Sequence, residues 1–344
     1  MVKVLFRVDA STKIGLGHLL RSLSLALALK TLGTESLFLT NNLSSSQKRV
    51  EPHGFAVNAL PSVGSWTAED IKSTLELADW NRCRTILVDS HEVGEDYLAQ
   101  LRSAGLFVIV RDDLALQPFS CQMLINGNAD AGQLPYHSSS GDTQFLLGPK
   151  YIVLRPEYQG LPTRNISASV HNVLVILGGA DSKNLMPSIL NLLDKIPVDF
   201  AVTAVVGPFF DNLTHIQAAA KNANRIISLI YCPDSVHDLM LEADLAISAA
   251  GQTLYELACS GCPSVAIKVA SNQSGQMRAM ESAGFLQGSI DSGDRDCWDI
   301  IGESAARLLI DPAARQRLST TGQLLVDGQG AQRVAEAIMQ KLIS

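Results

Sequence analysis

A histidine beside two glycines is the first candidate for chemistry in this sequence. Gly15-Leu16-Gly17-His18 follows a short apolar segment, and the good helix formers from Leu19 onward predict a helix that begins near His18. The positive end of a helix dipole disfavours imidazolium, so the ring is expected to be neutral and able to accept a proton. His18 is therefore a candidate general base, with Asp9 a candidate to orient it. The alternative is structural: a histidine packed on a turn and an aspartate that caps one.

Backbone amides around Gly17 lie at the same predicted helix start and suit an anion. The spacing is not a dinucleotide fingerprint, because G-x-G-x-x-G would need glycine where Leu20 stands. Polar residues also follow two later strand patterns: Asp89 and His91 after 85–88, and Asp112-Asp113 after 107–110. Ligands of parallel sheets lie at the carboxyl ends of strands, so these residues either line a binding cleft or simply terminate their strands.

A glycine pair opens the second half of the sequence. Gly178-Gly179-Ala180-Asp181 follows the buried strand pattern 173–177 and leads toward a helix. Such a turn suits close approach of the backbone to a phosphate, although glycine pairs also occur in ordinary turns.

A longer motif runs from Ser248 to Leu257. Small residues and Gly251 lead from a strand end into a predicted helix start, where free amides form an anion site. Glu256 is a candidate acceptor for a ribose diol, but its position three residues after Thr253 is also that of a capping box. Asn272 and Gln273, after the next strand pattern, carry neutral amides that suit hydroxyl or phosphate groups and are equally ordinary in a loop.

Composition and motifs exclude several classes of protein. A net charge of −7 argues against a nucleic-acid binder, and no apolar run is long enough to span a membrane. Cys259-x-x-Cys262 lacks a second ligand pair, so both cysteines are expected to be buried packing residues rather than a zinc or redox site. Six scattered cysteines fit a reducing interior, and no H-E-x-x-H motif or acidic cluster indicates a metal. We therefore expect a soluble, cytoplasmic, monomeric protein without a metal.

The elements that must position these residues alternate along the chain. Apolar strand patterns such as 2–7, 85–88, 173–177 and 245–247 are followed by polar loops and helical stretches, which is typical of parallel α/β sheets. The pattern lapses between Gly148 and Ser169. We predict a Rossmann-like domain over 1–150, a linker over 151–168 and a second Rossmann-like domain over 169–344. The last helix, 331–343, is a candidate to return to the first domain.

The combined motifs resemble those of a known family. Phe6-Arg7-Val8-Asp9-Ala10-Ser11 and Ile14-Gly15-Leu16-Gly17-His18-Leu19-Leu20-Arg21 resemble the N-terminal signature of the PseG family, the UDP-2,4-diacetamido-2,4,6-trideoxy-β-L-altropyranose hydrolases of pseudaminic acid biosynthesis. The turn at 178–181 is similar to the family's G-G-[ST]-D, with Ala180 as a departure. The 248–257 loop is similar to its S-A-G-G-T-T-x-x-E-L, with Ala250 and Gln252 as departures, and Asn272-Gln273 matches its N-Q pair. The second half also resembles the UDP-binding domain of MurG-type glycosyltransferases.

The resemblance implies a GT-B architecture, in which two Rossmann-like domains face a central cleft and the C-terminal one holds most of the nucleotide. It implies hydrolysis of a UDP-sugar at the anomeric carbon, with His18 as the catalytic base and no metal, and no cofactor is expected. Asp9 stays a candidate to assist His18 on its position in the sequence alone. Nucleotide or phosphate contacts are expected from Gly17, Gly178, Gly179, Asp181, Ser248, Gly251, Gln252, Thr253, Glu256, Asn272 and Gln273. Sugar contacts are expected from Arg21, Asp89, His91 and Asp113.

Two alternatives remain open at this stage. A glycosyltransferase of the same fold would deliver the sugar to an acceptor hydroxyl instead of water, and a non-catalytic binding protein would hold the nucleotide sugar without turning it over. The sugar itself is not identified, because its stereochemistry is recognised by the geometry of the site rather than by a motif.

Overall fold

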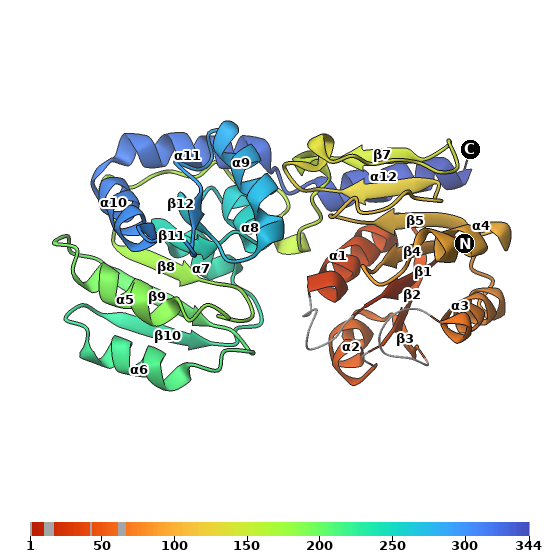
Figure 1. Cartoon of the computed structure of the whole chain (residues 1–344), viewed down its shortest axis with the longest axis horizontal. Helices are drawn as coiled ribbons and strands as arrows, with labels where there is room; N and C mark the ends of the chain where they lie inside the picture. The colour runs from red at the N-terminus through yellow and green to blue at the C-terminus, as the bar shows by residue number, and fades with distance from the viewer. Residues whose placement is uncertain (1, 10–16, 42, 61–66, 344) are drawn as a thin grey trace. The chain divides into compact units, whose positions relative to one another are not determined.

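The computed structural model describes residues 2–9, 17–41, 43–60 and 67–343, which form two compact units (Figure 1). The N-terminal unit comprises Met1–Pro156 and Gly328–Ser344, and the C-terminal unit comprises Glu157–Asp327. Ala10-Ser11 and Ile14-Gly15-Leu16, which carry part of the family resemblance, lie outside the described residues.

The N-terminal unit is built on a seven-stranded sheet in the order β3-β2-β1-β4-β5-β6-β7, and every neighbouring pair of strands is parallel. Its strands are β1 (Lys3–Val8), β2 (Glu35–Thr40), β3 (Ala56–Ala59), β4 (Thr85–Asp89), β5 (Phe107–Arg111), β6 (Met123–Asn126) and β7 (Gln144–Leu147). Its helices are α1 (Gly17–Thr31), α2 (Leu43–Val50), α3 (Ala68–Trp80), α4 (Glu95–Ser103) and α12 (Gly330–Ile343), with short 3-10 turns at Glu51–His53, Ala131–Gln133 and Pro149–Tyr151. The central strands are apolar and almost fully buried, as a sheet covered on both faces requires.

The C-terminal unit contains a six-stranded parallel sheet in the order β10-β9-β8-β11-β12-β13. Its strands are β8 (Asn172–Ile176), β9 (Ala201–Val206), β10 (Ile227–Tyr231), β11 (Leu245–Ala249), β12 (Ser264–Lys268) and β13 (Ile290–Asp291). Its helices are α5 (Met186–Asp194), α6 (Leu213–Asn222), α7 (His237–Glu242), α8 (Thr253–Cys259), α9 (Ser274–Ser282), α10 (Cys297–Ile310) and α11 (Pro312–Leu325). A 3-10 turn at Pro156–Tyr158 spans the change of unit, and another at Ser271–Gln273 precedes α9.

Both sheets have the same strand order, which reverses direction between the first strand and the fourth strand of each unit. In such a doubly wound sheet, the loops at the carboxyl ends of these two strands border the ligand site. In the N-terminal unit the reversal falls between β1 and β4, and in the C-terminal unit between β8 and β11. The prediction of two parallel α/β sheets is confirmed.

The last helix belongs to the N-terminal unit, although it follows the C-terminal unit in the sequence. The chain leaves the N-terminal unit after Pro156, inside the expected linker, and returns to it at Gly328. α12 brings Val334, Ala335 and Ile338 into the same buried cluster as Leu19 and Leu23 of α1. Figure 1 shows this blue helix among the elements of the N-terminal unit. An apolar stripe at helical spacing therefore completes the first core rather than the second.

Candidate active site

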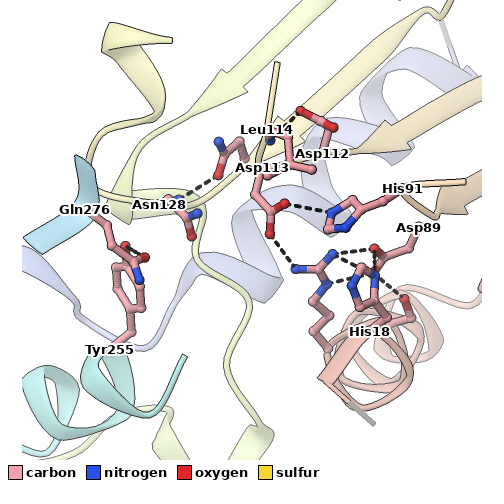
Figure 2. Close-up of polar contacts among 12 residues, drawn as sticks. His18, Asp89, His91, Asp112, Asp113, Leu114, Asn128, Tyr255 and Gln276 are labelled. Carbon is pink, nitrogen blue, oxygen red and sulfur yellow. Dashed lines mark hydrogen bonds and ion pairs between the residues drawn. The ribbon is translucent and has the colours of Figure 1, made fainter. Parts of the chain in front are cut away.

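His18 lies at the first turn of α1, where its side chain is fixed by a buried carboxylate. The helix begins at Gly17, and only 8% of His18 is exposed. Its Nδ1 lies 2.7 Å from Oδ1 of Asp89, the last residue of β4 (Figure 2). Because β4 pairs with β1 on the side away from β2, the sheet order brings Asp89 to the start of α1, where His18 lies.

The charge state of Asp89 determines the tautomer of the histidine. Burial alone would raise the pKa of Asp89, but the charge of Arg21 and the hydrogen bonds with Arg21 and His18 outweigh it and hold this pKa well below its ordinary value. Arg21 Nη2 also lies 3.0 Å from this Nδ1, but an ionised oxygen at 2.7 Å would face a lone pair unless Nδ1 carried a proton. Nδ1 is therefore the donor to Asp89, and its contact with Arg21 is not a hydrogen bond. The neutral ring then presents Nε2 as a proton acceptor, as a general base requires.

Arg21, one turn further along α1, fixes the position of Asp89 beside His18. Its Nε donates to Asp89 Oδ2 at 2.8 Å, its Nη2 donates to Asp89 Oδ1, and its Nη1 lies 3.4 Å from Asp113 Oδ2. Ser22 adds a hydrogen bond from its hydroxyl to Asp89 Oδ2 at 3.1 Å. Asp89 is 0% exposed, so it cannot contact a sugar directly as expected from the sequence. Among the described residues, its side chain contacts His18, Arg21 and Ser22.

Asp9 does not contact His18, although its position in the sequence made it the candidate to orient that ring. Its carboxylate accepts a hydrogen bond from Arg7 Nη1 at 2.6 Å and another from the Ser90 hydroxyl. Arg7 bridges in turn to Asp70 on α3 at 2.9 Å. The carboxylate that orients His18 is thus Asp89, and Asp9 belongs to a buried charge cluster beneath the β4–α4 loop. Arg7 and Asp9 are two residues apart, which places them on one side of an extended chain.

A second histidine–aspartate pair lies beside the first. His91 Nε2 lies 2.7 Å from Asp113 Oδ1, and the His91 ring meets the His18 ring edge-on, with centroids 4.9 Å apart (Figure 2). The hydrogen bond with Asp113 raises the pKa of His91 against the opposing effect of burial. For Asp113, burial is outweighed by the His91 hydrogen bond and the Arg21 charge, which hold its pKa well below the usual range. The structure therefore brings Arg21, Asp89, His91 and Asp113 together around His18.

The raised pKa of His91 predicts a pH-dependent contribution to stability. A folded-state pKa above the ordinary value of about 6.5 gives stability that is present below that pH and lost as the pH rises through the raised pKa. The difference in unfolding free energy between the wild type and His91→Gln should thus be larger at pH 6 than at pH 9. Urea denaturation of both proteins at the two pH values measures it. An equal difference at both would show that the ion pair does not contribute.

In the C-terminal unit the glycine turn after β8 is held by Asp181. The carboxylate of Asp181 accepts the backbone N–H groups of Leu185 and Met186, each at 2.8 Å, at the start of α5. Asp181 is 5% exposed, so its role in the structure is to fix this helix start rather than to face a ligand. Gly178 has φ +86°, which favours glycine, and Gly179 is exposed. Gly178, Gly179 and Ala180 remain the accessible part of the motif.

The loop from β11 to α8 is packed against the turn before α9. Gln276, which the sequence analysis did not select, donates from Nε2 to the carbonyl of Ala250, and its Oε1 accepts the Tyr255 hydroxyl at 3.0 Å (Figure 2). Gln273 Oε1 accepts the backbone N–H of Val269 at 2.8 Å, so this side chain shapes its own turn. Ser248 is fully buried and its hydroxyl donates to the Ala249 carbonyl at 2.9 Å.

The residues of this loop that remain accessible are the ones expected to meet a nucleotide. Gln252 and Asn272 are exposed, and Gly251, Thr253 and Glu256 are half-buried. α8 starts at Thr253 with Gln252 as its N-cap, so Thr253 is already inside the helix. A capping box needs the hydroxyl residue at the N-cap itself, so the capping interpretation of Glu256 does not fit this helix start.

Glu256→Ala is expected to weaken the binding of UDP. A hydrogen bond to a charged group is worth about 1.5–3 kcal/mol, which corresponds to about 10- to 150-fold in affinity. Titration calorimetry with UDP and a thermal melt of the same variant separate the two interpretations. Unchanged affinity with a lower melting temperature would contradict the ribose assignment and restore a purely structural one.

The two cysteines of the C-x-x-C motif lie in the interior of the C-terminal unit. Cys259 and Cys262 are buried, and burial raises their pKa values to about 12 and about 11, as expected of packing residues. Within residues 2–9, 17–41, 43–60 and 67–343, no cluster of histidine, cysteine and carboxylate side chains could hold a metal ion. Over the same residues, no helix has the length and apolarity needed to cross a bilayer.

Solved structures identify the class of fold. MurG of Acinetobacter baumannii aligns with a TM-score of 0.72 at 15% identity, covering 98% of this chain and 99% of that one. Two parallel sheets of doubly wound order and this likeness define a GT-B fold. No family model matches the sequence.

Curated relatives narrow the resemblance further. The UDP-2,4-diacetamido-2,4,6-trideoxy-β-L-altropyranose hydrolase of Campylobacter jejuni is 26% identical over 259 residues, which cover 74% of this chain and 87% of that protein. An uncharacterized protein of Methanocaldococcus jannaschii is 26% identical over 77% of this chain, and the spore coat polysaccharide biosynthesis protein SpsG of Bacillus subtilis is 28% identical over 59%. The chain spans only 55% and 60% of the lengths of these last two. The chain is thus similar to a PseG-type hydrolase along most of its length, which is the resemblance that its motifs predict.

Proposed function

We propose that this protein hydrolyses a UDP-sugar at the anomeric carbon, releasing UDP and the free sugar. The observation that carries the proposal is the 2.7 Å contact between His18 Nδ1 and the buried, ionised Asp89, which leaves Nε2 as a base at the start of α1. A base oriented by a second group in this way is what activation of a water molecule requires. The likeness to a named UDP-sugar hydrolase supplies the substrate class.

The proposed reaction is a single displacement. The oxygen of water attacks C1 of the sugar while the bond between C1 and the β-phosphate oxygen breaks, and its electron pair leaves with UDP. His18 Nε2 takes the proton of the attacking water, and the imidazolium formed is stabilised by Asp89. The ring gains positive charge in the transition state, next to the buried carboxylate of Asp89. Because opposite charges attract, this carboxylate stabilises the transition state more than the resting site.

The C-terminal unit is proposed to hold the nucleotide. Amides at Gly178, Gly179 and the start of α8 would meet the diphosphate, and Glu256 would accept the ribose hydroxyl groups. Gln252, Thr253, Asn272 and Gln273 provide further polar groups near that loop, with Ser248 and Asp181 behind it as supports. In the N-terminal unit, Gly17 and His18 would face the reacting bond, and Arg21, His91 and Asp113 would contact the sugar.

The substrate proposed first is the one named for the Campylobacter jejuni relative, UDP-2,4-diacetamido-2,4,6-trideoxy-β-L-altropyranose. The product would then be free 2,4-diacetamido-2,4,6-trideoxy-L-altrose, an intermediate of pseudaminic acid biosynthesis. The test is incubation with a panel of UDP-sugars without acceptor, measuring UDP release. Release of UDP and free sugar supports the hydrolase. Turnover only after an alcohol is added would indicate a glycosyltransferase, and binding without turnover a nucleotide-sugar-binding protein.

Activity is expected to survive EDTA, and the first product is expected to have the inverted anomeric configuration. Oxygen-rich carboxylate clusters suit Mg²⁺, and none is formed by the residues that the structure describes. The base is positioned for water, and a single displacement inverts the carbon that it attacks. NMR spectra of the first turnovers in chelator record both outcomes. Loss of activity would reveal a metal requirement, and net retention would require a side-chain nucleophile.

A further inference from the structure

The N-terminal unit contains a cavity next to His91 that the proposed reaction does not use. It has a volume of about 340 Å³ and lies at the carboxyl ends of β4 and β5, between the loops that follow these strands. Its apolar wall is formed by Val93, Leu98, Val110, Leu114, Leu116 and Phe119. Its volume falls within the range of about 300–1,000 Å³ that is common for small-molecule sites.

Most polar groups that line the cavity already form hydrogen bonds within the protein. Ser90 donates to Asp9 and accepts the Glu92 N–H at 3.1 Å. Asp112 Oδ2 accepts the N–H groups of Leu114 and Ala115 and the Tyr136 hydroxyl. Gln117 donates to the Val93 carbonyl at 2.9 Å. These bonds hold the two loops in place and leave the apolar wall as the main surface for a ligand.

His91 and Glu92 differ from these polar lining groups, and the Glu92 carboxylate has no partner among the described residues. His91 Nε2 is bound to Asp113, and the described residues supply no partner for its Nδ1. Its side chain remains 28% exposed. The hydrogen bond with Asp113 raises the pKa of His91, and the charged ring donates from Nδ1. The cavity therefore combines a polar ring nitrogen with an apolar wall.

The same histidine connects the cavity to the proposed base. The rings of His91 and His18 touch edge-on, with 4.9 Å between centroids, so the cavity begins one ring away from His18. A sugar whose anomeric carbon lies at His18 could therefore extend a ring substituent past His91 into the cavity.

We propose that this cavity receives an N-acyl substituent of the sugar, with the amide carbonyl on His91 Nδ1 and the alkyl part against Val93, Leu114 and Phe119. The inference rests on the proposed UDP-sugar hydrolysis and defines its substrate class further. An anionic substituent would meet the carboxylates of Glu92 and Asp112 at the same cavity. A neutral carbonyl matches His91 Nδ1, and the carbon atoms that follow it match the apolar wall. An acetyl group alone would leave part of the 340 Å³ cavity unfilled. Acyl chains longer than acetyl are therefore accepted.

Substrates with different acyl chains test the inference in the full-length protein. The kcat/KM of an N-butyryl UDP-sugar should equal or exceed that of the N-acetyl form in the wild type. Leu114→Phe, which narrows the cavity, should lower the N-butyryl value at least tenfold more than the N-acetyl value. Leu116→Ala removes apolar wall and should also weaken the N-butyryl substrate. Leu324→Ala is its matched control, because Leu116 and Leu324 are 82% and 81% exposed and Leu324 lies in the C-terminal unit.

Binding of small amides provides a readout that does not depend on turnover. In NMR titrations, N-ethylbutyramide should bind about tenfold more tightly than N-ethylacetamide, because each buried methylene contributes about 0.8 kcal/mol. The shifts should centre on Val93 and Leu114, and Leu114→Phe should abolish the preference. Equal binding by wild type and Leu114→Phe, or butyrate binding as tightly as the amide, would overturn the inference. Absence of UDP release from every sugar, with this amide pattern intact, would instead overturn the proposed hydrolysis.

Discussion

His18→Asn is expected to lower kcat for UDP-sugar hydrolysis by about two to four orders of magnitude, the usual contribution of a general base. The asparagine side chain can accept a hydrogen bond from water but cannot take its proton. The affinity for UDP should change little, because the proposed nucleotide contacts lie in the C-terminal unit. Steady-state rates of UDP release and calorimetric titration with UDP measure the two quantities.

A matched control for this variant is His53→Asn. His53 is exposed and lies in a short turn of the same unit, so its replacement should leave kcat unchanged. Near-normal turnover by His18→Asn would remove His18 from the mechanism. A large loss of UDP affinity in the same variant would indicate a binding role instead.

Asp89→Asn is expected to produce the second large effect, although Asp89 is too deeply buried to touch the substrate. An asparagine amide can donate to His18 Nδ1 and stabilise the tautomer that carries its proton on Nε2, which is unable to act as the base. Loss of an orienting carboxylate beside a catalytic histidine costs up to about 10⁴-fold in kcat. The variant leaves Arg21 with Asp113 as its remaining carboxylate, so the loss of unfolding free energy should be smaller than the about 3–5 kcal/mol that an uncompensated buried charge costs.

Asp9→Asn separates positioning of His18 from general damage to the site. Asp9 binds Arg7 and Ser90, and Arg7 keeps Asp70 as a partner after the change. This variant should lose stability while keeping kcat within about tenfold of the wild type, because the tautomer of His18 is unaffected. Raising the pH should not restore Asp89→Asn, whose defect is the position of a proton. Equal kcat losses in both variants, measured below their melting temperatures, would contradict the assignment of Asp89 as the positioning residue.

The alternation of strands and helices could be predicted from the sequence, but the neighbours of each strand could not. His18 and Asp9 follow the same strand pattern, so proximity along the chain favoured Asp9 as the partner. The pairing of β1 with β4 makes Asp89 the partner instead, because Asp89 lies opposite Val8 in the register. This pairing joins segments far apart in sequence and is set by the packing of the whole sheet.

Some elements of the structure give weak signals in the sequence. β3 (Ala56–Ala59) and β7 (Gln144–Leu147) form the edges of the N-terminal sheet and are short and only partly buried. They lack the long apolar pattern that identifies β4 or β8, and short strands are common at sheet edges. Gln276 was missed for a different reason: a glutamine within a helix pattern looks like a solvated residue until the fold places it against Ala250.

The exact start of α8 illustrates the same limit at the scale of one residue. The spacing of Thr253 and Glu256 fits a capping box only when the threonine precedes the helix. The chain turns one residue earlier, with Gln252 at the N-cap, and the hydroxyl is then inside the first turn. Gln276 holds the loop before α8 through the Ala250 carbonyl, and the local sequence does not specify this contact.

In the proposed reaction, water activated by His18 attacks the anomeric carbon. Acceptor-free turnover in water enriched in oxygen-18, with mass spectrometry of both products, shows which atom the water attacks. We predict one labelled oxygen in the released sugar, none in UDP, and the loss of this reaction in His18→Asn. Label in UDP would place the attack at phosphorus, and the absence of any product until an alcohol is added would show that water is not the acceptor.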